Sequence, residues 1–135
     1  MSEKVQSVQR IYEAFGRGDV PAVLDELADD VQWEAWENNH AQNAGVAHLT
    51  PRTDKEGVAA FFGLVGGLGV KEFLVLDIGE SDRQVMAEIV IETDSYRDEE
   101  IHLWTFGDEG KVTRMRHYVD TAKHMAAAGL PAEAV

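Results

Sequence analysis

The sequence predicts an α+β domain in which helices lie across one face of a curved antiparallel sheet. Apolar residues recur at helical spacing in the N-terminal part, whereas residues 70–119 read almost entirely as strands. The turns between these strands are short, so neighbouring strands must run antiparallel. Two opening helices, a strand, a third helix and a meander of strands together define this class. With 135 residues, the chain is expected to form a single domain over residues 1–135.

The N-terminal residues predict two helices. Residues 3–17 place apolar side chains at helical spacing and should form an amphipathic helix. Asp19 offers an N-cap for a second helix, with Pro21 in its first turn. The second helix is expected to bury three apolar side chains, those of Val23, Leu24 and Leu27.

An alternating pattern over residues 31–35 predicts the first strand. Residues 37–52 are rich in Asn and look like a long loop with little regular structure. Thr53 followed by Glu56 has the spacing of a capping box, which predicts that a third helix begins there. The buried face of this helix would carry Val58, Phe61, Phe62 and Val65.

The pattern predicts four further strands, over residues 70–78, 83–95, 100–106 and 111–119. The run from Gly107 to Gly110 has the composition of a hairpin turn between the last two strands. The acidic residues 98–100 should form a solvated turn. Asp120 is expected to cap a short Ala-rich tail helix that ends at Gly129.

The hairpin turn decides which residues face one another across the last two strands. A two-residue turn at Glu109-Gly110 would place His102 opposite His117. The same register sets Trp104 opposite Met115. A four-residue loop would instead place His102 opposite Met115. Because directly opposed side chains have Cβ atoms about 4.5–5.5 Å apart, the first register would bring two imidazoles together.

The composition excludes several classes of function. The chain has no cysteine, which excludes disulfides, thiolate nucleophiles and cysteine-ligated metals. Its 12 basic and 25 acidic residues give a net charge of −13, which would repel nucleic acid and anionic lipid. No apolar run reaches the roughly 18 residues of a membrane span, and the polar N-terminus resembles no secretory signal, so a cytoplasmic location is expected. No phosphate loop or dinucleotide fingerprint is present, and neither a cofactor nor a metal is expected.

Several stretches of the chain resemble the nuclear transport factor two-like superfamily. They are the run from Gly18-Asp19-Val20 to Gln32-Trp33, then Gly57-Val58 and Phe61-Phe62. The similarity spans residues 3–128 and implies a cone, in which a strongly curved sheet wraps around helices and leaves an apolar pocket open at one end. It also implies a homodimer formed through the outer face of the sheet. That face fits four apolar residues expected to point away from the core, Val90, Ile101, Leu103 and Val112.

The last two strands resemble the SnoaL-like and ketosteroid-isomerase-related branch of this superfamily. The residues that carry the similarity are His102-Leu103-Trp104-Thr105-Phe106, Gly110-Lys111-Val112 and Tyr118-Val119-Asp120-Thr121. The general base and the two oxyanion donors of ketosteroid isomerases would fall on Ala35, Ile11 and His102, so that chemistry is not expected in its usual form. The Trp-Asp-x-x-Asp pattern of the polyketide cyclases falls on His117 and Asp120, so a different base occupies its first Asp position.

The sequence therefore favours a cofactor-independent enzyme that moves a proton on a small apolar carbonyl compound, as an isomerase or cyclase would. His117 would be the base and His102 the electrophilic donor or second base, with Asp120 as a further catalytic candidate. Burial and mutual repulsion would lower the pKa of both imidazoles. The side chains expected to shape the substrate pocket are Tyr12, Trp33, Phe61, Trp104 and Met115.

Each of these roles has a structural alternative. Either histidine could satisfy a hydrogen bond in the core, and Asp120 could serve as a helix cap. Tyr12 could cover the seam between helix and sheet, and the other aromatic residues could be core. His48 lies in the 37–52 loop, which could cover the pocket opening, although loop histidines are usually solvated. The alternative function is a non-catalytic module that binds a hydrophobic ligand, or another protein chain through its sheet.

Overall fold

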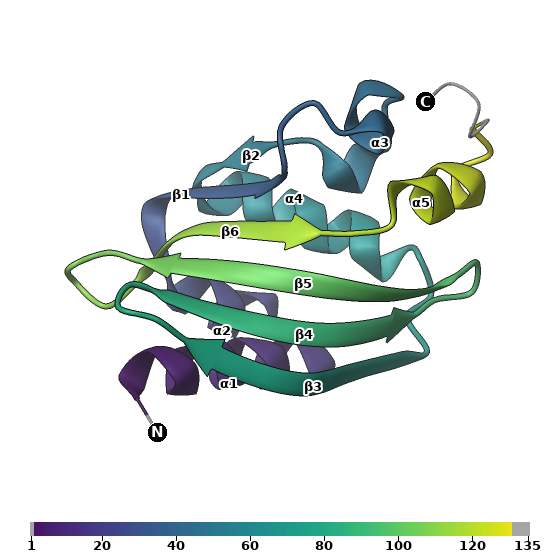
Figure 1. The fold of residues 1–135 in the computed structure, drawn as a ribbon. Coiled ribbons are helices and arrows are strands. Elements are labelled where there is room, and N and C mark those ends of the chain that lie inside the picture. The colour runs from purple at the N-terminus through teal and green to yellow at the C-terminus, as the bar shows by residue number, and fades with distance from the viewer. Residues whose placement is uncertain (1, 131–135) are drawn as a thin grey trace.

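The computed structural model describes residues 2–130 and has one curved, open sheet of six strands with helices packed against one face (Figure 1). The strands follow the order β2-β1-β6-β5-β4-β3 across the sheet. This arrangement is the α+β cone that the sequence predicts. The elements in chain order are α1 (Glu3–Gly16), α2 (Val20–Asp25), β1 (Leu27–Ala35), α3 (His40–Asn43), the 3-10 turn η1 (Ala47–Leu49), β2 (Arg52–Thr53), α4 (Asp54–Gly66), β3 (Glu72–Glu80), β4 (Gln84–Glu92), β5 (Arg97–Phe106), β6 (Val112–Tyr118) and α5 (Thr121–Ala127).

Helices α1 and α2 begin at side-chain caps. The Ser2 hydroxyl accepts a hydrogen bond from the Val5 N–H at 3.1 Å. The Asp19 carboxylate accepts from the Ala22 N–H at 3.1 Å, as the sequence predicts. Leu27 was expected at the end of α2, and this assignment is wrong. It opens β1 instead, because the chain extends there to pair with β6, and its side chain stays buried in the core.

Strand β1 makes the sheet mixed. It runs antiparallel to the short edge strand β2 and parallel to β6. A long stretch of chain separates β1 from β6, which is what a parallel connection requires. All pairings among β3, β4, β5 and β6 are antiparallel, as their short turns predict.

The segment over residues 37–52 is more regular than its composition predicts. The Asn39 side chain caps α3 by accepting from the Gln42 N–H at 2.8 Å, and η1 follows. Both turns pack against α5 around a small apolar cluster. Local composition does not reveal this packing, because the partner helix lies far along the chain. The buried members of the cluster are Ala35, Ala41, Val46, Leu49 and Met125.

Helix α4 starts where the sequence places it, but the predicted capping box does not form. Thr53 makes no side-chain cap bond, since its backbone already belongs to β2. The Asp54 carboxylate accepts from the Gly57 N–H at 2.9 Å instead. Asp54 has a φ of 60°, a left-handed conformation that short polar side chains tolerate better than most.

The hairpin between β5 and β6 reaches the predicted register through a different turn. His102 pairs with His117. The Gly107 N–H donates to the Lys111 carbonyl at 2.9 Å, which makes the loop three residues long rather than two. An irregularity after Thr105 then shifts the pairing by one residue. The bulge therefore compensates for the longer loop, and the two histidines still face one another.

The main core lies between the helices and the concave face of the sheet. Trp104, Ile11 and Met115 are among its largest buried side chains. Val112 was expected on the outer face, which is wrong: it is fully buried in this core, next to the bulge that reverses its direction. Ile101 and Leu103 do alternate with buried neighbours and stay partly exposed. Within residues 2–130, no helix is long and apolar enough to cross a membrane.

Candidate functional site

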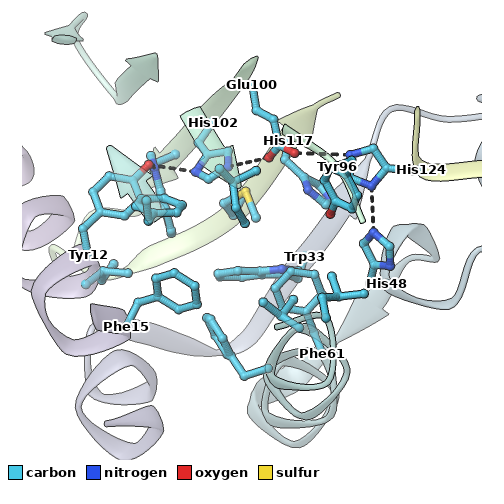
Figure 2. Close-up of a pocket in the computed structure, with 18 residues that line it drawn as sticks. Tyr12, Phe15, Trp33, His48, Phe61, Tyr96, Glu100, His102, His117 and His124 are labelled. Atoms are coloured by element: carbon cyan, nitrogen blue, oxygen red, sulfur yellow. Dashed lines mark hydrogen bonds and ion pairs between the residues drawn. The ribbon is translucent and has the colours of Figure 1, made fainter. Parts of the chain in front are cut away.

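A cavity lies between α1, α4 and the concave face of the sheet (Figure 2). Aliphatic and aromatic side chains form most of its wall, and a band of histidines, tyrosines and one carboxylate runs along one side. It encloses about 70 Å³ of free space.

The cavity wall includes every residue predicted from the sequence to form the site except one. Asp120 does not line the cavity. It lies at the start of α5, where its carboxylate accepts from the Lys123 N–H at 3.3 Å. The residues that the structure brings together at the wall are His102, His117, Tyr12, Trp33, Phe61, Trp104 and Met115.

His102 and His117 face one another across β5 and β6 without bonding to each other. Their ring centres are 6.3 Å apart and their planes are inclined by 69°. Phe61 stands edge-on to His117, with ring centres 5.9 Å apart. The two imidazoles therefore share one wall but have different hydrogen-bonding environments.

His102 belongs to a hydrogen-bonded chain that starts at the apolar end of the cavity. The Trp104 indole N–H donates to the Tyr12 hydroxyl oxygen at 3.1 Å, and that oxygen lies 2.8 Å from His102 Nδ1. His102 Nε2 lies 3.3 Å from Glu100 Oε1. Since a carboxylate only accepts, Nε2 carries a hydrogen and donates it to Glu100, while Nδ1 shares a hydrogen bond with the Tyr12 hydroxyl. Tyr12 therefore reaches the cavity rather than only covering a seam.

A second chain starts at the other oxygen of Glu100. His124 Nε2 lies 2.8 Å from Asp98 Oδ2 and 3.4 Å from Glu100 Oε2. His124 Nδ1 lies 2.8 Å from His48 Nε2, so the loop histidine is tied to the tail helix. Glu100 joins the two chains into one network along the wall (Figure 2).

The acidic residues 98–100 do not form the solvated turn predicted from the sequence. Asp98 is 1% exposed and Glu100 is 7% exposed, while Glu99 between them faces solvent. The reason is that β5 begins at Arg97, three residues earlier than the pattern indicated. Alternate side chains of this extension therefore point inward, and histidines satisfy both carboxylates there.

The buried charges of this network stabilise one another. Burial works to raise the pKa of Glu100, but hydrogen bonds from His102 and His124 outweigh it and hold that pKa well below its usual range. Burial likewise works against the charged form of His124, yet its bonds to Asp98 and Glu100 raise its pKa to about 9. Burial raises the pKa of Asp98; the hydrogen bond from His124 opposes this effect and the nearby Glu100 charge adds to it. At neutral pH one imidazolium thus lies between two carboxyl groups.

His117 lines the same cavity but is not part of this hydrogen-bonded network. Burial lowers its pKa to about 3, and the Glu100 charge opposes this effect only in part. The ring is 5% exposed and neutral at pH 7. Neither ring nitrogen has a hydrogen-bond partner among residues 2–130. The cavity therefore offers a neutral imidazole whose nitrogens are available to a ligand.

A family model described as SnoaL-like domain matches residues 8–115. The chain belongs to the SnoaL-like family. No sequence among the curated proteins is significantly similar to it. Solved structures share the fold: an NTF2-like protein of unknown function from Burkholderia pseudomallei superposes with a TM-score of 0.77 at 24% identity, covering 94% of this chain and 98% of that one.

Two further structures resemble this SnoaL-like domain. An NTF2-like protein from Burkholderia xenovorans has a TM-score of 0.71 at 22% identity and covers 93% of this chain and 95% of its own. TerC, co-crystallised with polyporic acid, has a TM-score of 0.76 at 18% identity, and the match covers 95% of this chain and 99% of TerC. At such identities the likeness establishes the shared nuclear transport factor two-like fold.

Sequence reasoning missed four polar residues of this SnoaL-like site. Asp98 and Glu100 continue the alternation that leads through His102 to Trp104, so the period-two pattern could have placed them on the inner face. His124 and Tyr96 carry no comparable signal. One lies on a short helix and the other in a turn, and each depends on how that element docks against the sheet.

The Asp98, Glu100 and His124 side chains also have spacing that a cation could use. Their ligand atoms lie within 4.8 Å of one another. However, the His124 proton already bonds to both carboxylates, and the Asp120 N–H donates to Asp98 at 3.3 Å. The cluster is thus a set of satisfied hydrogen bonds, and its chemistry is that of a buried ion pair.

Proposed function

We propose that this SnoaL-like domain is a cofactor-independent enzyme that transfers a proton on a small apolar carbonyl compound, as an isomerase or cyclase does. The environment of His117 carries the proposal. This imidazole is buried on an apolar wall, is neutral at pH 7 and has no bonding partner among the described residues. A neutral imidazole with an unbonded nitrogen can accept a proton from a ligand bound beside it, and the Glu100 charge works to raise its basicity.

His117 would remove a hydrogen from the carbon next to the carbonyl group. The C–H bond breaks, an N–H bond forms on the imidazole, and the electron pair moves onto the carbonyl oxygen as an enolate. The Glu100 charge favours the protonated form of His117, so it stabilises the imidazolium formed in this step. In a ketone with a neighbouring carbon–carbon double bond the enolate extends over that bond, and return of the proton to its far carbon completes an isomerisation. In a cyclisation the enolate carbon instead attacks a second carbonyl group of the ligand, and the alkoxide formed there takes the proton back from the imidazolium.

In this proposal His102 is a positioning residue rather than the electrophilic donor expected from the sequence. Both of its ring nitrogens are occupied, one by Tyr12 and one by Glu100. These bonds orient the Glu100 carboxylate, whose charge acts on His117. TerC, a protein of the same fold, was co-crystallised with polyporic acid, which is consistent with a small organic ligand for this domain.

Deuterium exchange into a ketone tests the proposal without knowledge of the natural substrate. We expect the wild-type protein to accelerate exchange of the hydrogens next to the carbonyl of 2-indanone in D2O, measured by proton NMR. His117→Ala should reduce this acceleration by about 10²–10⁴-fold, the usual contribution of a general base. His40→Ala, which removes an exposed histidine from α3, is the matched control.

Circular dichroism and thermal melting establish whether each variant is folded before rates are compared. Exchange that persists in a folded His117→Ala protein would assign the base to another group. Tight ketone binding without wild-type exchange would favour the alternative function, a non-catalytic module for hydrophobic ligands.

A further inference from the structure

The Tyr96 hydroxyl is a second polar group of the cavity that the hydrogen-bonded network does not use. Over residues 2–130, the polar side chains at the wall without a hydrogen-bond partner are those of His117, Trp33 and Tyr96. The Trp33 indole nitrogen is completely covered by neighbouring side chains, so a ligand cannot reach it without rearrangement. Tyr96 and His117 are therefore the two groups left to meet a ligand.

The turn between β4 and β5 holds Tyr96 in place. The Thr93 hydroxyl oxygen accepts from the Ser95 N–H at 3.2 Å and the Tyr96 N–H at 3.3 Å. The Thr93 N–H donates to the Tyr96 carbonyl at 2.8 Å. The phenol ring packs on His124, with ring centres 4.5 Å apart. Figure 2 shows Tyr96 at the same end of the cavity as His117 and His124. The contacts above hold the ring, and its hydroxyl has no hydrogen-bond partner among residues 2–130.

The charges around Tyr96 decide what its hydroxyl can bind. Burial raises the pKa of Tyr96, and the charges of Glu100 and Asp98 raise it further, so the phenol keeps its proton and acts as a donor. With His124 protonated, these three groups carry a net negative charge. An anionic ligand would be repelled at this end of the cavity, whereas a neutral carbonyl oxygen would be accepted.

We propose that Tyr96 donates a hydrogen bond to the carbonyl oxygen of a neutral ligand whose adjacent carbon faces His117. This inference rests on the proposed function and deepens it by naming the oxygen-binding residue and the charge of the substrate. As His117 takes the hydrogen from carbon, negative charge moves onto the oxygen. Tyr96 keeps its proton and stabilises that charge through the hydrogen bond.

Three probes with one bicyclic body test the inference by titration calorimetry: 2-indanone, indane and indane-2-carboxylate. The wild-type protein should bind the ketone more tightly than the carboxylate. Tyr96→Phe should weaken ketone binding about fivefold to tenfold, the effect of one lost hydrogen bond, and leave indane binding unchanged. Tyr118→Phe is the matched control, because that ring stacks on Trp36 away from the cavity.

The outcomes separate this inference from the proposed function. Unchanged ketone affinity in Tyr96→Phe, carboxylate binding as tight as ketone binding, or no binding of any probe would each overturn the inference. If wild-type exchange occurs and Tyr96→Phe retains its rate and affinity, the proposed function stands and the inference fails. If exchange is absent but Tyr96→Phe selectively weakens ketone binding, the oxygen-binding role stands and catalysis fails.

Discussion

The buried carboxylate of Glu100 connects the two hydrogen-bonded chains of the site, one through His102 and one through His124. One oxygen lies 3.3 Å from His102 and the other lies 3.4 Å from His124. A charge at this depth without partners would strongly destabilise the fold, so both histidines stabilise the structure as well as shape the site. Substitution of any of the three groups therefore has to be tested for folding before it is interpreted as chemistry.

Tyr12→Phe should destabilise the protein by about 1–3 kcal/mol, because it leaves two buried polar groups without a partner. These groups are the Trp104 indole N–H and His102 Nδ1, which both bond to the Tyr12 hydroxyl. The phenylalanine ring fills the same space, so packing is retained. Urea denaturation measures the change, and a loss no larger than that of Tyr118→Phe would contradict the role assigned to this hydroxyl.

Stability should be greatest near about pH 6.5, the ordinary pKa of histidine. His48 and His117 have pKa values lowered to about 4 and about 3, mainly by burial. Below pH 6.5 the unfolded chain therefore binds more protons on them, and stability falls as the pH drops. His124 has a pKa raised to about 9, so its contribution is complete below pH 6.5 and is lost as the pH rises through 9.

His124→Gln should remove the alkaline decline in stability between pH 6.5 and 9 and keep the acid one. In the wild type that decline is on the order of 3 kcal/mol, because folding raises the pKa of His124 from 6.5 to about 9. Urea denaturation at several pH values measures the free energy of unfolding on the acid and on the alkaline side of pH 6.5. An alkaline decline of equal size in the variant would show that another group is responsible for it.

At the scale of elements, strand β5 has some features that the sequence predicts and others that it does not. The alternation through His102 and Trp104, with a nearby turn, is local information and predicts the hairpin and its register. Burial of Asp98 and Glu100 is not local, because it depends on His124, which α5 brings to the sheet. The same holds for the turns over residues 37–52, whose regular structure depends on packing against α5.

His48→Leu should loosen the contact between η1 and α5. The substitution removes the 2.8 Å bond between His48 Nε2 and His124 Nδ1 and leaves a buried donor on His124. Amide hydrogen exchange should become faster over residues 39–50 and 121–128 and stay unchanged in the central strands. Equal protection of both segments in the variant and the wild type would mean that their apolar cluster alone holds them together.

At the scale of the molecule, the outer face of the sheet has no covering layer of helices in Figure 1. Leu103 pairs with Met86 on this face, and Leu74 pairs with Val90 on the neighbouring strands. Met86 is 52% exposed and Leu74 is 40% exposed. Val90 is 4% exposed, and the charged Glu88 and Glu99 lie on the same face. Exposed apolar side chains on an uncovered sheet face are typical of a protein interface. Its occupant is predicted to be a second copy of the chain, as the family resemblance implies.

The double variant Met86→Lys with Leu103→Lys should convert the predicted homodimer into a monomer. It places two like charges on adjacent strands of the outer face, where the twofold interface would bring them close to the same charges of the partner. Light scattering coupled to size-exclusion chromatography measures the mass. Leu64→Lys, on an exposed position of α4, is the matched control and should stay dimeric. A monomeric wild type, or a double variant that remains dimeric, would exclude this face as the interface.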